Sequence, residues 1–126
     1  MKFLCLICAE KVMEDMPAAD AHALFQKYAA FTGDVKQQGH FLGGNRLLPA
    51  ATAVTVRVRD GKISTTDGPY AETKEQLGGY YLIEAKDRNE AIQIAAKIPG
   101  AHLGCVEVRQ IAEDPQTLAL ELDART

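Results

Sequence analysis

The stretch Lys2-Phe3-Leu4-Cys5-Leu6-Ile7-Cys8 sets the fold, because every residue after the lysine is apolar. In a strand, successive side chains point to opposite faces, so residues 3, 5 and 7 share one face and residues 4, 6 and 8 share the other. Both faces are therefore apolar, and each needs cover from another layer. The stretch predicts a strand in the centre of a sheet.

Two helices are expected. Pro17 suits the first turn of a helix, and apolar residues then recur at i, i+3, i+4 and i+7 spacing as far as residues 38–39. A second helix is indicated by Asp87 as its N-cap, with Glu90 three residues later, and it ends at Pro99-Gly100. Both segments are long enough to cover one face of a sheet.

The remaining segments predict strands. Residues 52–66 read as a hairpin, because valines alternate with polar residues and Asp60-Gly61 favours a type I′ turn. Further strands are expected at 41–48, 80–84 and 104–110, with a polar, turn-rich stretch at 67–79. Within that stretch, residues 72–76 form either a short helical turn over a cleft or a solvated loop.

This element order is a split β-α-β arrangement with an added hairpin, an antiparallel sheet and both helices on one face. We expect a ferredoxin-like α+β fold formed by residues 1–111, followed by a short helix or loose tail at 112–126. One sheet face then lacks helices although the first strand is apolar on both sides. The pattern predicts a homodimer in which two open faces pack together.

The composition limits the classes of function that this chain can have. The 126 residues have a mass of 13.7 kDa, which suits one domain, and carry a net charge of −3 with acids and bases interspersed. A nucleic-acid binder is disfavoured because basic residues do not cluster. The longest apolar run, residues 3–9, is too short to span a membrane, and no cleavage site follows it. We expect a cytoplasmic protein that binds neither nucleic acid nor membrane.

The three cysteines, Cys5, Cys8 and Cys105, are odd in number and favour reduced thiols over a disulfide framework. Cys5 and Cys8 have C-x-x-C spacing, but in a strand they point to opposite faces, so buried thiols are favoured over a redox or zinc pair. The three histidines have no metal-ligand spacing, and no P-loop or dinucleotide motif occurs. We expect no metal and no cofactor.

Residues 67–84, Asp-Gly-Pro-Tyr-Ala-Glu-Thr-Lys-Glu-Gln-Leu-Gly-Gly-Tyr-Tyr-Leu-Ile-Glu, resemble the signature of the DGPF branch of the YCII-related family. Thr-Val-Arg-Val-Arg-Asp-Gly-Lys at 55–62 and Cys-Val-Glu-Val-Arg at 105–109 extend the similarity over most of residues 1–111. The resemblance implies a dimeric α+β barrel, in which two ferredoxin-like sheets pack face to face. It implies no defined activity.

The sequence also departs from the family pattern. Tyr70 stands where Phe is usual, and Gln110 where Pro often follows Glu-Val-Arg. Core members are credited with a His on the first helix and an Asp in an Asp-Pro step after the second. Here Tyr28 and Phe31 occupy the matching part of the helix, and the step reads Ile98-Pro99. That pair is not carried over.

His40 and Asp67 are the candidate catalytic residues. His40 follows the first helix, and an imidazole near a carboxylate exchanges protons near neutral pH, provided that the two residues lie close together. Asp67 either caps a turn before Gly68 or takes part in ligand binding or proton transfer.

The predicted substrate-binding residues are polar or aromatic side chains near these two: Arg46, Tyr70, Glu72, Lys74 and Tyr81. Tyr80 and Tyr81 point to opposite faces, so one lines the open face and the other packs under a helix. Glu107 and Arg109 favour a surface ion pair over an anion site. His22 is expected in solvent, and His102 as a surface or packing residue.

Two functions remain open at this point. The first is a small-molecule enzyme that performs acid–base chemistry, such as isomerisation or elimination, on a small polar ligand in the barrel cleft. The second is a non-catalytic binding or regulatory module that presents the Arg57/Arg59 hairpin or the acidic tail to another protein. The fold alone does not decide between them.

Overall fold

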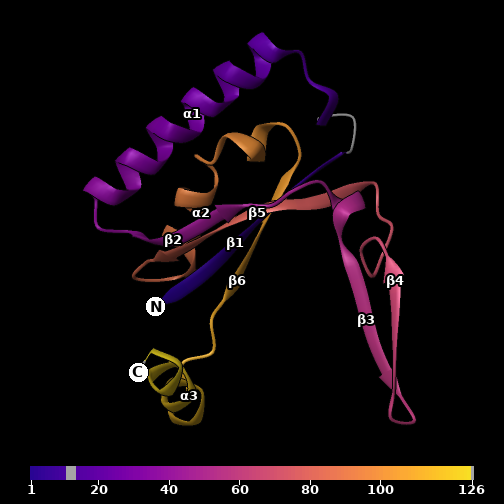
Figure 1. Cartoon of the computed structure of the whole chain (residues 1–126). Coiled ribbons are helices and arrows are strands. Elements are labelled where there is room, and N and C mark those ends of the chain that lie inside the picture. The colour runs from indigo at the N-terminus through magenta and orange to yellow at the C-terminus, as the bar shows by residue number, and fades with distance from the viewer. Residues whose placement is uncertain (11–13, 126) are drawn as a thin grey trace.

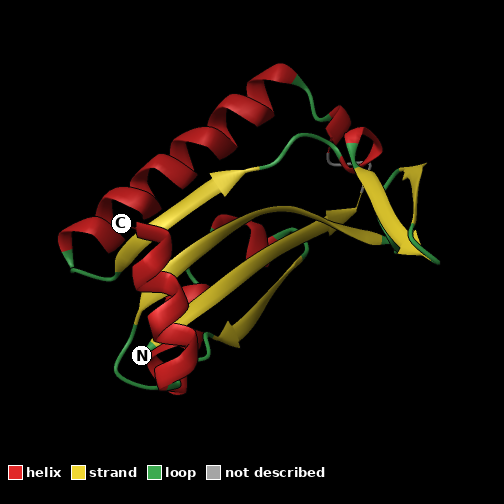
Figure 2. Ribbon diagram, turned by 60° about the horizontal axis from the view of Figure 1, so that its bottom comes forward, coloured by secondary structure: helices red, strands yellow, loops and turns green. Residues whose placement is uncertain are grey.

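The computed structural model describes residues 1–10 and 14–125, with the backbone alone for residues 121–125. Figures 1 and 2 show an antiparallel sheet with α1 and α2 on one side and a hairpin that projects from one end. The elements are β1 (Lys2–Glu10), α1 (Ala18–Gln37), β2 (Phe41–Arg46), η2 (Ala50–Thr52), β3 (Val54–Arg59), β4 (Lys62–Asp67), β5 (Glu75–Glu84), α2 (Arg88–Ala95), η3 (Pro99–His102), β6 (Cys105–Gln110) and α3 (Pro115–Arg125).

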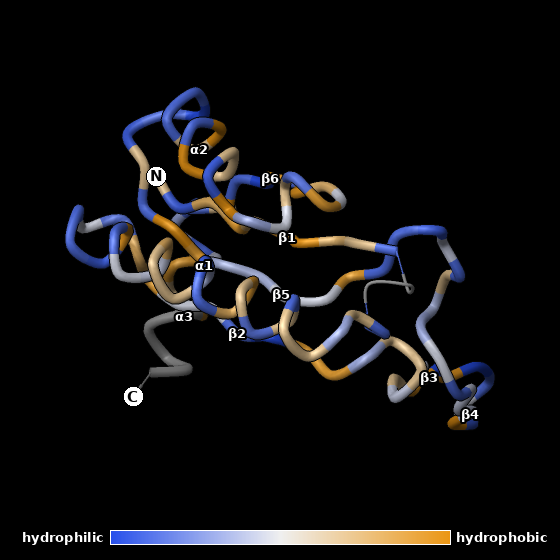
Figure 3. The backbone as a smooth tube through the Cα atoms, turned by 90° about the horizontal axis from the view of Figure 1, so that it is seen from above, coloured by the Kyte–Doolittle hydropathy of each residue, from blue (hydrophilic) through white to orange (hydrophobic). Residues whose placement is uncertain are grey.

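The main sheet has the order β2-β5-β1-β6, and all of its pairs are antiparallel. This confirms the ferredoxin-like α+β fold and the central position of the first strand. On the helix-covered face, Phe3 and Cys5 of β1 and Ile83 of β5 are buried beneath α1 and α2. Much of β1 is drawn in the hydrophobic colour in Figure 3. The core therefore lies between the sheet and the two helices.

The prediction for residues 67–79 was partly wrong. Strand β5 begins at Glu75, five residues earlier than expected, because Glu75, Gln76 and Leu77 pair with the last residues of β1. Of the two alternatives for residues 72–76, the helical turn does not form, since Glu75 and Gln76 belong to this strand. The two glycines, Gly78 and Gly79, do not end the strand, and an added Cβ at Gly79 would lie 3.0 Å from the Asn45 carbonyl oxygen. Because β2 approaches so closely, a residue with a Cβ is disfavoured at position 79.

The hairpin forms as predicted. Asp60 and Gly61 have φ values of 52° and 74°, as a type I′ turn requires, and Val58 pairs with Ile63. β3 and β4 form a separate two-stranded sheet. In Figure 1 this sheet points away from α1 and α2, on the opposite side of the main sheet. The hairpin is therefore an arm and not an extension of the main sheet.

The second helix begins where the sequence indicates. The Asp87 carboxylate accepts a hydrogen bond from the Glu90 backbone N–H at 2.8 Å, and the Glu90 carboxylate accepts one from the Lys86 N–H at 2.9 Å. The first of these bonds is the N-cap, and the second closes a reciprocal pair like a capping box. The helix ends earlier than expected, because α2 stops at Ala95, and Pro99, the expected stop, opens the short η3 turn.

The segment 112–126 contains a helix, α3, and its last residue, Thr126, lies outside the described residues. Asp114 begins the helix, since its carboxylate accepts hydrogen bonds from the N–H and the hydroxyl of Thr117. These bonds hold the pKa of Asp114 below its usual value. None of the helices in the described part of the chain is long and apolar enough to cross a membrane.

Candidate functional site

Five of the seven predicted site residues lie at one end of the subunit, around the base of the hairpin. Asp67 is the last residue of β4, and Arg46 is the last residue of β2. Tyr70, Glu72 and Lys74 lie in the loop that joins β4 to β5. All five are exposed, and Tyr70 has 85% of its surface exposed. Their side chains face solvent in the single subunit.

The turn after Asp67 is held by two hydrogen bonds of Gly68. The Gly68 N–H donates to the Ala53 carbonyl oxygen at 2.7 Å, and the Thr55 hydroxyl donates to the Gly68 carbonyl at 2.8 Å. Gly68 has a φ of 101°, which favours glycine. Among the described residues, the Asp67 carboxylate accepts no hydrogen bond. Asp67 therefore does not cap this turn as one interpretation of the sequence proposed.

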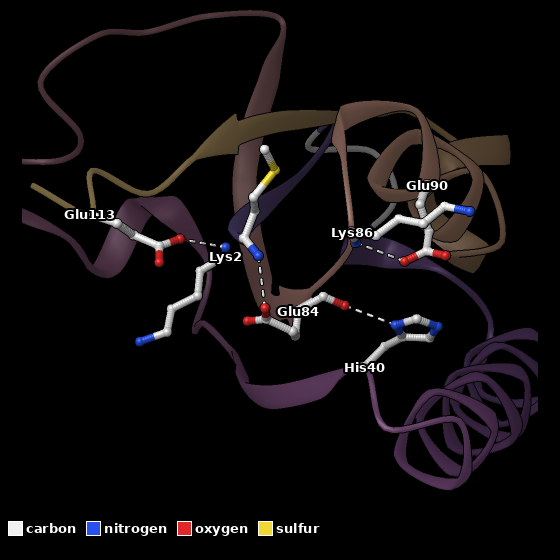
Figure 4. A network of polar contacts seen from close by, with 7 residues as sticks. Lys2, His40, Glu84, Lys86, Glu90 and Glu113 are labelled. Atoms are coloured by element: carbon white, nitrogen blue, oxygen red, sulfur yellow. Dashed lines mark hydrogen bonds and ion pairs between the residues drawn. The ribbon is translucent and has the colours of Figure 1, made fainter.

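His40 lies at the other end of the sheet, in the polar network of Figure 4. Its Nδ1 donates to the Glu84 carbonyl oxygen at 2.8 Å, and the Glu84 N–H donates to the His40 carbonyl at the same distance. Because a carbonyl oxygen can only accept, Nδ1 carries a proton, and in the neutral ring Nε2 holds the lone pair. The Met1 amine belongs to the same network, because it forms an ion pair with the Glu84 carboxylate at 2.7 Å.

The structure does not bring His40 and Asp67 together within one subunit. β5 spans 10 residues, from Glu75 beside the hairpin end to Glu84 beside His40. At about 3.4 Å per residue the strand is about 30 Å long. Proton exchange between the two side chains of one chain is therefore impossible in this arrangement.

Tyr81 is a core residue. Its exposed fraction is 9%, its ring packs edge-to-face against Phe31 and Phe41, and its hydroxyl lies 2.7 Å from the Thr32 hydroxyl. Tyr80 is the tyrosine on the open face, where its hydroxyl accepts a hydrogen bond from Asn45 at 2.7 Å. Substrate binding was predicted for Tyr81, but its side chain is packed beneath α1.

A polar row crosses the open face of the sheet. Leu6 of β1 pairs with Glu107 on one side and with Tyr80 on the other. Glu107 forms an ion pair with Arg109 at 2.5 Å, as the sequence favoured. Both charged side chains are about half exposed or more, so the pair adds little to stability. The apolar residues on this face are leucines, namely Leu4, Leu6 and Leu82.

Two thiols meet at the far edge of this face. Cys8 pairs with Cys105 across β1 and β6, whereas Cys5 is buried on the helix side, so the C-x-x-C residues separate as expected. Desolvation, and then the neighbouring thiol and the carboxylates of Glu75 and Glu107, raise the pKa of Cys8; desolvation, and then Glu75, raise that of Cys105. Protonated thiols are poor nucleophiles. The described residues include no group of three or more His, Cys, Asp or Glu side chains placed to hold a metal ion.

A groove runs along the helix side of the molecule, between α1 and the α2–η3 segment. Its volume is about 450 Å³, within the range of small-molecule sites. The walls are apolar and are formed by Leu24, Phe31, Val35, Ile94, Pro99 and Leu103, while Lys27, Asp34, Lys97 and His102 contribute the ionisable groups. Sequence reasoning missed this combination. Lys27, Asp34 and Gln38 recur at helical spacing beside the apolar stripe, but only the fold places His102 opposite them.

The positions of the family's His and Asp pair are occupied by packing contacts beside this groove. Burial is the main cause that raises the pKa of Tyr28, while the neighbouring Gly100 backbone acts in the opposite direction. Ile98 is fully buried. An added Cβ at Gly100 would lie 2.5 Å from the Tyr28 oxygen, so the glycine is required here. The two positions thus hold packing residues in place of the family's pair.

A family model described as the YCII-related domain matches residues 1–114. The chain belongs to this family. An uncharacterised protein of Rhizobium meliloti (strain 1021) is 36% identical over 105 residues, which cover 82% of this chain and 75% of that protein. Assignment to the DGPF branch remains a prediction.

One solved structure shows the same fold. It is the 5-chloro-2-hydroxyhydroquinone dehydrochlorinase TftG of Burkholderia phenoliruptrix AC1100, in complex with 2,5-dihydroxybenzoquinone. The TM-score is 0.52 over 92% of this chain and 98% of that chain, at 15% sequence identity. The YCII-related chain thus shares the α+β fold of that protein. At this identity the likeness extends to the fold alone.

Proposed function

We propose that this chain is a small-molecule enzyme of the acid–base type whose ligand binds in the groove between α1 and η3. The proposal rests on this groove, which has a volume of about 450 Å³ and apolar walls. An imidazole, a carboxylate and two ammonium groups also line it. Convergence of a few polar groups on an apolar pocket is typical of ligand sites.

The groups suggest a substrate class. Lys27 and Lys97 outnumber the Asp34 carboxylate, so with a neutral His102 the rim carries a net positive charge that favours an anionic substituent. The apolar walls suit a hydrocarbon ring. His102 is the proposed general acid or base, and Asp34 lines the same groove. A small, ring-containing anion is the expected substrate.

The fold is compatible with such chemistry, since TftG is an enzyme that acts on a hydroxylated ring. Its ligand also supplies a probe. We suggest titrating the isotopically labelled full chain with 2,5-dihydroxybenzoquinone and with benzoate, and following backbone amide shifts. The proposal expects the largest shifts at Lys27, Asp34 and His102.

Variants test the assignment of roles. Ala30→Phe fills the groove and should weaken probe binding at least tenfold, and Lys27→Ala should weaken binding of the anionic probe. His102→Ala should abolish turnover of any substrate found, whereas His22→Ala, at an exposed position outside the groove on α1, is the matched control. Shifts confined to the open face around Tyr80 would reject the groove.

The open face supports a second candidate. The polar side chains of this face, which are Glu107, Arg109, Tyr80 and Asn45, lie beside leucines that a second subunit would cover. A two-fold axis perpendicular to the strands would also lay the His40 end of one copy over the Asp67 end of the other. In this proposed arrangement, the catalytic pair forms between His40 of one subunit and Asp67 of the other. Loss of turnover in both His40→Ala and Asp67→Asn, restored by mixing the two variants, would favour it.

A further inference from the structure

The hairpin exposes a row of large apolar side chains. Val54, Val56 and Val58 lie on one face of β3, and Ile63 of β4 lies opposite Val58. Their exposed fractions are 57%, 59%, 56% and 76%. The other face carries Arg57, with polar residues around it. Alternation of this kind is typical of a strand pair with one buried face and one solvated face.

No residue in the described part of the subunit covers the apolar face of this arm. Eleven of the twelve strand residues are exposed, Thr55 being the exception, and β3 and β4 make their main contacts with each other. An isolated two-stranded hairpin is marginally stable in water. A covering surface would stabilise it.

The surface area of the subunit indicates how much cover is missing. The chain exposes 9101 Å². A monomeric protein of 13.7 kDa is expected to expose about 6,600 Å². The difference, about 2,500 Å² for each subunit, is enough for a large, stable dimer interface.

The direction of the arm indicates that its partner is a second copy on the open face of the sheet. Figure 1 shows the hairpin at one end of the sheet and α3 at the other, both extending on the side away from α1 and α2. A second copy that covers the open sheet face would therefore lie between them, alongside the arm. Such a copy would meet both the hairpin and the leucines of the open face.

We propose that the hairpin is a dimerisation arm whose valine face packs against a second copy of this chain. The arm face that carries Arg57 and Ser64 stays in solvent. The inference goes beyond the proposed function, because the groove lies on the opposite side of the sheet and is complete in one subunit.

Sedimentation equilibrium of the full chain tests the arm. We expect a dimer at micromolar concentration and a dissociation constant raised at least 100-fold in the double variant Val56→Asp/Ile63→Asp. Ser64→Asp is the matched control, since it adds a charge to the opposite face of the same hairpin and should leave dimerisation unchanged. Circular dichroism and probe binding in the groove should persist in all three proteins.

A photo-reactive benzoylphenylalanine at position 63 gives a second readout. Irradiation of a mixture of light and heavy isotope-labelled chains should produce cross-links between the two kinds of chain. A wild-type monomer at all concentrations, an unchanged dimer in the double variant, or cross-links only within one chain would each overturn the arm. Probe binding that fails while the dimer persists would reject the groove alone.

Discussion

The Tyr81 hydroxyl donates a hydrogen bond to the Thr32 hydroxyl across 2.7 Å of the core. The direction is determined because the only hydroxyl hydrogen of Thr32 is directed to the Tyr28 carbonyl oxygen at 2.8 Å. Strand β5 is thereby bonded to α1 beneath the helix layer. The contact makes Tyr81 part of the packing that holds helix and sheet together.

Tyr81→Phe should lower the free energy of unfolding by about 1 kcal/mol, because it removes one buried hydrogen bond and leaves Thr32 with another partner. Chemical denaturation measures the change. Tyr80→Phe is the control on the open face, where the lost bond from Asn45 is exposed and should cost less than about 0.5 kcal/mol. A larger loss for Tyr80 than for Tyr81 would contradict the assignment of the two faces.

Gly33→Ala should stabilise the protein by about 0.5–1 kcal/mol, because alanine favours the helix and a Cβ at this site meets nothing within 4 Å. Thermal or urea unfolding detects the change. Gly100→Ala should instead destabilise the protein by about 1–3 kcal/mol, since its Cβ would lie 2.7 Å from the Ile7 side chain as well as against Tyr28. Equal effects of the two variants would disagree with the packing around η3.

Asp87→Ala should cost about 1 kcal/mol in unfolding free energy, since the N-cap bond to the Glu90 N–H is lost. Asp87→Asn keeps a side-chain oxygen in the same place and should cost much less. Comparison of the two by urea denaturation separates capping from other effects of the substitution. Similar losses in both would indicate that the carboxylate charge, and not the cap, matters.

Stability should decline at high pH through Cys5. Burial raises the pKa of this thiol from 9.0 to about 11 in the folded chain. Because the folded pKa is the higher one, the contribution is complete below pH 9 and is lost as the pH rises through 11. At about 1.4 kcal/mol per pKa unit, the wild type should lose about 2–3 kcal/mol more than Cys5→Val between these limits. Parallel pH profiles of the two proteins would contradict this.

Local chemistry determined the elements of this protein. The apolar residues of β1, the Asp60-Gly61 turn and the Asp87 N-cap each act within a few neighbouring residues, so their positions follow from the amino-acid sequence. The element order then restricts the chain to one main sheet with α1 and α2 on one side. The family resemblance agreed with this reasoning, and the family model confirmed that the chain is YCII-related.

Contacts between distant segments decided the site. Sequence neighbours cannot show that β5 starts at Glu75, because the extra residues are held by pairing with β1. The same pairing separates His40 from Asp67 by the length of a strand and sends Tyr81, not Tyr80, into the core. His102 reaches the groove of Asp34 only because η3 packs beside α1. Periodicity specifies which residues share a face, whereas strand register and layer packing specify what that face meets.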